Sequence, residues 1–379
     1  MFDYEVLRLI WWVLVGVLLI GFAVTDGFDM GVGALLPFLG KTDTDRRVMI
    51  NTIAPHWDGN QVWLITAGGA LFAAWPMVYA TAFSGFYIAL ILTLMALFFR
   101  PVGFDYRSKL ESSRWRNTWD WCLFIGGFVP PTVIGVAFGN LLQGVPFSVD
   151  QYMRTTYTGS FFELLNPFGL LAGVISLCMF LTQGSTWLMM KTEGALLDRA
   201  RKSTMLFAFL TAVLFAAAGF WIAHGIDGYT IVKFAGTHAP SNPLNKEVAV
   251  SAGAWLQNYS TYPWMMAAPV CGLAMAVLTI IAARFDKGGF AFLFSSLTIA
   301  GVILTAGFSM FPFIMPSSLN PVFSLTMWDA TSSQNTLTVM TFAAAIFVPI
   351  VLGYTIWTYI KMFGRVSGQF VEKNKHSVY

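Results

Sequence analysis

The sequence predicts an all-α polytopic membrane protein with nine transmembrane helices. Of the 379 residues, 56% are hydrophobic and only 11% are charged, whereas a soluble domain carries about 25% charged residues. Apolar runs of about 20 residues, the length that crosses the hydrocarbon core of a bilayer, recur along the chain. Lysine and arginine collect in alternate connections between these runs, as they do in multi-pass membrane proteins.

The nine apolar runs extend over nearly the whole chain. We expect helices at about 9–28, 56–75, 79–99, 121–142, 163–187, 204–224, 262–283, 290–311 and 336–359. The start of the chain is acidic where a cleaved signal peptide would be basic, so we expect the first run to stay in the mature protein. We predict one integral membrane domain over 1–379. It would comprise a first four-helix bundle at about 1–145, a second bundle plus an extra helix at about 160–360, and a polar cytoplasmic tail at 361–379.

The distribution of basic residues predicts the orientation of the chain. With nine helices, 18 of the 22 lysines and arginines fall on one side, and the other side holds only Arg8, Arg154, Lys233 and Lys246. The positive-inside rule then places the N-terminus in the periplasm and the C-terminus in the cytoplasm. The longest connection, about 225–261, would cap the outer surface. Small residues that would allow close helix approach include Gly135, Gly139, Gly169, Gly272 and Gly301.

Ionisable side chains at membrane depth indicate function, because each costs a few kcal/mol there without a partner or a purpose. We expect almost all of them within the first 110 residues. Asp26 and Asp29 lie three apart and so share one face of the first helix. In the second helix Asp58 and Gln61 share a face, and His56, next to Trp57, shares another face with Asn60. The third helix ends with Arg100, Asp105 and Lys109.

The ends of these three helices lie at the same predicted depth. Acids brought together in a low dielectric can hold and pass protons, so the set is a candidate proton relay. Each member also has a simpler interpretation. Asp26 and His56 would suit the membrane interface, Arg100 could extend its head group to the surface, and Asp105 with Lys109 could form a solvated ion pair.

The histidines do not suggest a haem or metal site on this chain. Only four are present: His376 in the polar tail, His238 in the outer connection, His224 at an outer helix end and His56 at an inner one. No two of them are expected to share a haem. His56 and Asp58 are two apart on a helix and so point in different directions, which makes a poor metal site. We therefore expect no metal and no haem ligand set here.

Three segments carry a resemblance to a known family. DGFDMG at 26–31, PHWDGNQVW at 55–63 and FFRPVGFDYR at 98–107 resemble signature segments of subunit II of the cytochrome bd quinol oxidases, and the similarity extends over the whole chain. It is close to the bd-I type of bacterial ubiquinol oxidase. The nine-helix layout with an outer N-terminus agrees with that family.

The resemblance implies a haem-free subunit of a quinol:oxygen oxidoreductase in the bacterial cytoplasmic (inner) membrane. Its partner would be subunit I, which in this family carries two haems b and one haem d, and small single-helix subunits could join them. Ubiquinol would be the substrate, with electrons passing to oxygen and protons arriving from the cytoplasm. A quinone or phospholipid bound on this chain, among membrane lipids, is compatible with this view. We expect no nucleic acid partner.

Matching positions carry the family's site residues onto this sequence. Asp58 matches the intramembrane acid of the proton channel, and Asp105 and Lys109 lie nearer its cytoplasmic entrance. Asp29 and Arg100 match positions associated with the integrity of the haem d and haem b site. Helix geometry adds their neighbours to the proton pathway, namely Asp26, His56, Trp57 and Gln61.

Two alternatives from other classes remain at this point. A proton-coupled secondary transporter would also place acids in the membrane, but it predicts inverted repeats and broken helices in both halves of the chain. The concentration of charge in one half argues against that class. A non-catalytic assembly or lipid-organising subunit is the second alternative, and it predicts that neutralising Asp58 leaves oxygen consumption intact.

Overall fold

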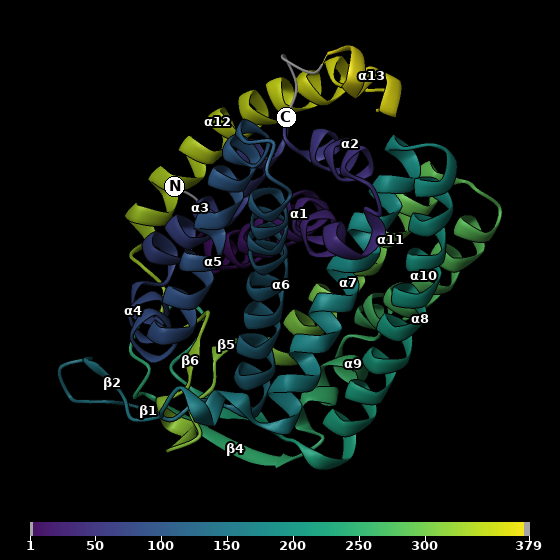
Figure 1. Ribbon diagram of the computed structural model, residues 1–379. Helices are drawn as coiled ribbons and strands as arrows, with labels where there is room; N and C mark the ends of the chain where they lie inside the picture. The colour runs from purple at the N-terminus through teal and green to yellow at the C-terminus, as the bar shows by residue number, and fades with distance from the viewer. Residues whose placement is uncertain (1–2, 375–379) are drawn as a thin grey trace.

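The computed structural model describes residues 3–374 as a bundle of long helices (Figure 1). Within this part of the chain, eight helices are long and apolar enough to cross a membrane. They are α1 (Tyr4–Leu39), α5 (Tyr87–Tyr106) with η1 (Arg107–Lys109), α6 (Ser113–Gln143), α7 (Pro167–Lys191), α8 (Gly194–Gly225), η4 (Pro263–Met266) with α10 (Ala267–Arg284), α11 (Gly288–Met310) and α12 (Gln334–Lys361). The predicted polytopic helical class is therefore confirmed, whereas the count of nine and the orientation stay predictions.

The second and third expected helices differ from the prediction. The run at 56–75 forms α3 (Trp57–Ala74), but its polar first turn sets it apart from the eight apolar helices of the described chain. The expectation of one helix at 79–99 is wrong, because α4 (Pro76–Gly85) ends there and α5 begins after Phe86. Gly85 is a poor helix former, and its missing side chain leaves room for the ring of Tyr157.

Short elements mark the two ends of the bundle (Figure 1). One end, here called the α2 end, carries α2 (Asp43–Ile53), η1 and α13 (Gly368–Lys373). The opposite end, here called the hairpin end, carries three two-stranded antiparallel sheets, so the fold is not purely helical. These are β1 (Phe147–Val149) with β2 (Thr155–Tyr157), β3 (Asp227–Phe234) with β4 (Lys246–Ala252), and β5 (Phe313–Met315) with β6 (Leu325–Thr326). The remaining short helices are η2 (Phe162–Leu165), η3 (Ala254–Leu256), α9 (Gln257–Thr261) and η5 (Pro321–Phe323).

The long connection at 225–261 caps the hairpin end. It folds into the β3–β4 hairpin, in which Asp227 pairs with Ala252 and Phe234 with Lys246. The hairpin is followed by Trp255, which is 1% exposed and donates its indole N–H to the carbonyl oxygen of Leu142 at 2.8 Å. The connection is therefore packed onto the end of α6.

The C-terminal segment at 361–379 is not simply a polar tail. Buried Lys191 donates from Nζ to the carbonyl oxygen of Met362 at 3.0 Å and lies 5.1 Å from the centre of the Phe363 ring. Farther along, α13 packs against α2, and its Val371 is 1% exposed. Residues up to 374 thus fold back onto the α2 end, while 375–379 lie outside the described residues.

The core forms around α1 and α7. In α1, nearly every residue from Phe22 to Leu36 is buried, and the helix contacts α2, α3, α6, α7 and α11. The most apolar stretch of α7 is 72% buried, whereas that of α12 is 0% buried, so α12 lies on the margin of this chain. Because α1 contacts helices from both halves, a division into two bundles stays a prediction.

Glycines let α10 and α11 approach closely, as expected for Gly272 and Gly301. A Cβ atom built on Gly301 of α11 would lie 2.5 Å from the backbone nitrogen of Gly272 in α10. At that distance a side chain cannot fit without moving a helix backbone.

Replacing Gly301 by valine is expected to prevent the packing of α10 on α11, at a cost of about 3 kcal/mol or more. The amount of subunit in isolated membranes, measured by immunoblot, should fall severalfold. Gly289→Val is the matched control on the same helix, since no atom lies within 4 Å of its Cβ position. Equal amounts of both variants would contradict the close approach.

Candidate functional site

A buried ion pair joins α1 to α5 inside the helical bundle. Asp26 and Asp29 project from the same face of α1 and are 0% and 1% exposed, and Arg100 of α5 is 2% exposed. The Arg100 guanidinium donates Nη1 to Asp26 Oδ2 at 3.0 Å and Nη2 to Asp26 Oδ1 at 2.5 Å. Asp29 Oδ2 lies farther from the guanidinium, 4.0 Å from Nη2. Arg100 therefore forms a bidentate salt bridge with Asp26 and only a longer ion pair with Asp29.

Asn60 and Tyr359 extend this cluster to two more helices. Asn60 of α3 is 1% exposed and donates Nδ2 to Asp29 Oδ2 at 2.7 Å. Tyr359 of α12 donates its hydroxyl to Asn60 Oδ1 at 2.6 Å. The other oxygen of Asp29, Oδ1, is buried without a hydrogen-bond partner among the described residues. We call Asp26, Asp29, Asn60, Arg100 and Tyr359 the buried polar cluster.

Aromatic rings surround this cluster. The ring of His56 is buried and stacks on the ring of Tyr359, with centroids 4.5 Å apart and planes 2° apart. Trp57 lies with its ring 5.8 Å from the Arg100 guanidinium carbon and 5.7 Å from the ring of Phe104. His56 and Trp57 thus border the cluster that helix geometry placed them near.

The other expected site residues lie at the surface. Asp58, Asp105 and Lys109 are exposed and Gln61 is half-buried. Asp58 and Gln61 belong to the first turns of α3, and Lys109 ends η1 at the α2 end. The structure therefore separates the predicted set in two, because it buries Asp26, Asp29, Arg100 and His56 and leaves Asp58, Asp105 and Lys109 outside.

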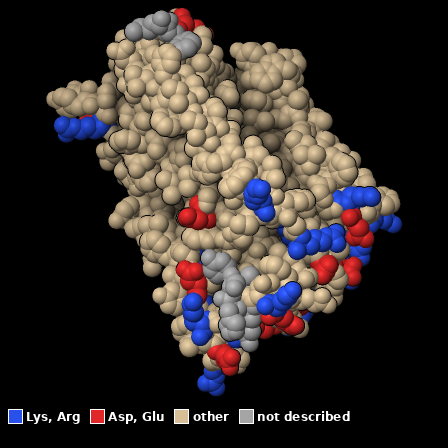
Figure 2. Space-filling view, turned by 90° about the horizontal axis from the view of Figure 1, so that it is seen from above, with Lys and Arg blue, Asp and Glu red and all other residues tan. Residues whose placement is uncertain are grey.

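A second buried charge network lies at the α2 end and includes Asp120, which follows the first 110 residues. Asp120 of α6 is 0% exposed and accepts hydrogen bonds from Arg46 Nη1 at 2.6 Å and Arg107 Nε at 2.5 Å. Asp43 joins it, because Arg107 Nη2 and Arg116 Nη1 each donate to its carboxylate at 2.9 Å. Figure 2 shows charged side chains gathered on one part of the face seen from above and an uncharged surface over much of the rest.

Sequence reasoning missed Asn60, Tyr359 and Asp120 as site residues. Asn60 had a weak signal, since it shares a helix face with His56. Tyr359 falls at the border of an apolar run, where an interfacial aromatic residue is expected anyway. Asp120 stands one residue before the expected start of its helix at 121 and so fell outside the expected membrane helices.

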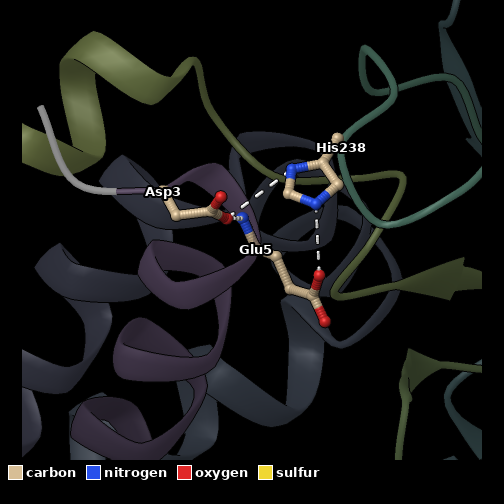
Figure 3. A group of neighbouring side chains, drawn as sticks. All are labelled: Asp3, Glu5 and His238. Atoms are coloured by element: carbon tan, nitrogen blue, oxygen red, sulfur yellow. Dashed lines mark hydrogen bonds and ion pairs between the residues drawn. The ribbon is translucent and has the colours of Figure 1, made fainter.

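The hairpin end carries a separate group of side chains that ties the start of α1 to the β3–β4 connection (Figure 3). His238 Nδ1 lies 3.6 Å from Asp3 Oδ1, and Nε2 lies 3.3 Å from Glu5 Oε2. The carboxylates have other partners, because Asp3 Oδ1 accepts the backbone N–H of Glu5 and Glu5 Oε2 accepts the hydroxyl of Thr237, each at 2.8 Å. Buried Arg8 donates to the carbonyl oxygens of Thr237 and Ala239. We interpret this group as an anchor for the connection rather than as a metal site.

An apolar cavity of about 440 Å³ lies among α1, α6, α7, α8, α10 and α11. Its lining includes Phe22, Phe138, Ala172, Phe215 and Val302. The cavity is separate from the buried polar cluster, none of whose members line it. Its size and apolar walls suit a hydrocarbon chain rather than a polar ligand.

The described histidines lie in three different parts of the chain. His56 has one ring face covered by Tyr359, and Trp187 packs against it at 6.0 Å between centroids. His224 stacks on Phe220 at the end of α8, and His238 takes part in the anchor at the hairpin end. His376 lies outside the described residues. The donor set therefore provides no facing pair of axial ligands in the described chain.

The fold and the cluster together define a polytopic membrane protein that encloses an acid and arginine cluster within its helices. A family model described as cytochrome bd terminal oxidase subunit II matches residues 7–362. The cytochrome bd-I ubiquinol oxidase subunit 2 of Escherichia coli is 66% identical over 379 residues, the full length of both chains. The chain belongs to the family of subunit II of the cytochrome bd terminal oxidases, which confirms the predicted oxidoreductase subunit.

More distant relatives agree with this assignment. The cytochrome bd ubiquinol oxidase subunit 2 of Bacillus subtilis is 35% identical over 364 residues, which cover 94% of this chain and 96% of the relative. A chain in the solved structure of the bd oxidase from Geobacillus thermodenitrificans superposes with a TM-score of 0.62 at 16% identity. That match covers 95% of this chain and 100% of the other, and it supports a shared fold.

Proposed function

We propose that this chain is the haem-free subunit of a quinol:oxygen oxidoreductase, where it conducts protons from the cytoplasm for the reduction of oxygen to water. The Escherichia coli relative is by name a ubiquinol oxidase subunit, and ubiquinol is the substrate we propose here. Subunit I would carry the two haems b and the haem d, with small single-helix subunits beside it. The complex would lie in the bacterial cytoplasmic membrane, with the N-terminus of this chain in the periplasm.

The observation that carries this proposal is the placement of polar groups on two faces of α3. Asn60 faces inward and reaches Asp29, whereas Asp58, two residues earlier, is exposed on a helix of membrane length. Charged and polar groups in a bilayer are costly and are retained where they have a function. Asp58 therefore lies on the open face of α3, and Asn60, close to it in sequence, reaches the buried acids. This arrangement supports a proton path that leaves this chain toward its partner.

The proposed entrance of this path lies at the α2 end. Asp105 and Lys109 are exposed near the end of α5 and in η1, on the side that the positive-inside rule assigns to the cytoplasm. Solvated acids collect protons from water and pass them on through groups in hydrogen-bond reach or through water. Asp58 and Gln61 would continue the path, with Asp26, His56 and Trp57 bordering it.

Support of the haem site is the second part of the proposal. Asp29 and Arg100 would act by holding α1 and α5 at one relative position, since both belong to the buried polar cluster. The haems themselves would be carried by the partner subunit, a proposal that agrees with the absence of a facing histidine pair among the described residues. The residues of this chain would therefore hold the helices beside the haem site in position, and the haem would supply the oxygen chemistry when it is bound by subunit I.

The apolar cavity is the proposed position for a quinone or phospholipid on this chain. Its walls come from six long helices and from the short helices η3, α9 and η4, and a chain of isoprenoid or acyl type would fill a volume of about 440 Å³. Such a molecule would stabilise the packing of α8 and α10 against α7. It would take no part in the proton path, because the buried polar cluster does not line the cavity.

Membership of the oxidase family favours this function over a proton-coupled transporter. The remaining alternative is an assembly or lipid-organising subunit, which needs no proton-carrying acid. Neutralising Asp58 distinguishes the two.

In the purified complex, Asp58→Asn is expected to lower quinol-dependent oxygen consumption per haem at least about tenfold, because an amide cannot carry the proton of an acid. Haem content, measured by absorbance, should stay near that of the unmodified complex. Asp198→Asn is the matched control, since Asp198 is an exposed acid that pairs with Arg201 on α8. Undiminished turnover at normal haem content would exclude the proposed role of Asp58.

A further inference from the structure

We propose that Tyr359 and Asn60 are positioning residues for Asp29, with the hydroxyl of Tyr359 fixing the orientation of the Asn60 amide that holds the Asp29 carboxyl. This inference rests on the proposed function, in which ionised Asp29 supports the haem site together with Arg100 by holding α1 and α5 in place. It assigns a role to the C-terminal helix α12, for which the sequence offered none.

Three helices meet in this chain of hydrogen bonds. Tyr359 Oη and Asn60 Oδ1 are 2.6 Å apart, and Asn60 Nδ2 and Asp29 Oδ2 are 2.7 Å apart. Both distances are short for their kinds and are typical of well-aligned bonds. The residues come from α12, α3 and α1, so the link joins segments that are 299 and 31 positions apart in sequence.

The direction of each bond follows from the chemistry of the groups. An amide has one oxygen that accepts and one nitrogen that donates, and the two are interchanged when the group turns over. The Tyr359 hydroxyl donates to the oxygen of Asn60 and so turns the nitrogen toward Asp29. Without the hydroxyl, only the acceptor oxygen of ionised Asp29 keeps the amide nitrogen facing it, and the amide can turn over to accept from Asp29 once that carboxyl takes a proton.

The Asn60 amide donates a hydrogen bond to Asp29, whereas Asp26 is held by Arg100. Asp26 receives two hydrogen bonds from Arg100, whereas Asp29 Oδ2 is 4.0 Å from the guanidinium. Asp29 Oδ1 is buried without a hydrogen-bond partner in the described chain, which leaves it free to take a proton. The bond from Asn60 is therefore the main hydrogen bond that stabilises the ionised form of Asp29.

The ring of Tyr359 is held in place independently of its hydroxyl. It stacks on His56 with planes 2° apart and meets the edges of Phe28 and Trp187 at 6.4 Å and 6.3 Å. Removal of the hydroxyl alone thus keeps these ring contacts. The charged and titratable groups next to Asp29 are Asp26 on α1, Arg100 on α5 and, through Asn60, Tyr359 on α12. Farther out, His56 stacks on Tyr359, and Lys191 lies over the ring of Trp187.

The test is the pH profile of oxygen consumption per haem in the purified complex, with quinol as the electron donor. In Tyr359→Phe the acidic limb of the profile is expected to move toward higher pH by about one unit, because ionised Asp29 loses its donor. Asn60→Ala, which removes the amide without altering α12, is expected to produce the same shift. Tyr354→Phe is the matched control, since this tyrosine is 60% exposed on the same helix.

A structural role alone would lower turnover equally at all pH values and would leave the limb in place. The inference is overturned if Tyr359→Phe and Asn60→Ala have the same profile as Tyr354→Phe while Asp29→Asn impairs turnover. If Asp29→Asn itself has the native turnover and profile, the proposed role of Asp29 has failed and this inference fails with it. The two failures are therefore distinguishable. Should either variant not assemble, the other still decides the outcome.

Discussion

Replacing Arg100 by methionine is expected to leave little assembled complex in the membrane. The guanidinium is 2% exposed and is the cation that the structure places between Asp26 and Asp29. Removing one partner of a buried ion pair costs about 3–5 kcal/mol, because the remaining charges stay buried without compensation. The haem absorbance per milligram of membrane protein should fall at least about tenfold. Arg201→Met is the control, since Arg201 makes ion pairs with the exposed acids Asp198 and Asp286.

A double variant tests whether uncompensated charge or the loss of the arginine contacts causes this defect. If uncompensated charge is the cause, Arg100→Met combined with Asp26→Leu should restore part of the lost complex, because both members of the closest pair are then apolar. Asp29 keeps its hydrogen bond from Asn60 in that variant. Equal loss in the single and double variants would mean that the arginine is needed for its contacts rather than for neutralising Asp26.

Local sequence patterns were sufficient for most of the long helices and for half of the site. Apolar runs of membrane length located most long helices, because a helix that crosses the hydrocarbon core needs about 20 predominantly apolar residues. The three-residue spacing of Asp26 and Asp29 placed both on one face of α1, which is the face that meets Arg100. The break at Phe86 and the short hairpins escaped prediction, since contacts with distant residues such as Tyr157 shape them.

The remaining site residues depend on tertiary contacts that no local pattern records. Tyr359 meets Asn60 across 299 positions, and an interfacial tyrosine looks the same in sequence whether or not it has a buried partner. Asp58 and Asn60 lie in one turn of α3, yet only the packing of α1 decides that Asn60 is the buried one. Burial of Asp120 likewise results from Arg46 and Arg107, which reach it from two other elements.

Replacing Asp120 by asparagine is expected to destabilise the α2 end. Asp120→Asn would leave Arg46 and Arg107 close together with the central carboxylate neutralised, and Arg107 is only 1% exposed. We expect a loss of about 3–5 kcal/mol, measured as a lower midpoint of thermal unfolding for the detergent-solubilised complex. Asp43→Asn is the graded control. Its carboxylate is 40% exposed, so its loss should lower the midpoint less.

The Asp120→Asn variant also shows whether Asp120 has only a structural role or carries protons. Asp120 is buried near the proposed entrance, since Arg107 precedes Lys109 by two residues in η1. If Asp120 only joins α6 to α2 and η1, the Asp120→Asn complex that survives purification will consume oxygen at the native rate per haem. If turnover per haem falls while the unfolding midpoint stays unchanged, Asp120 carries protons, and the entrance runs through the α2 end rather than over its surface. Because Asp58→Asn is expected to show the opposite pattern of low turnover at native stability, the two acids serve as controls for each other.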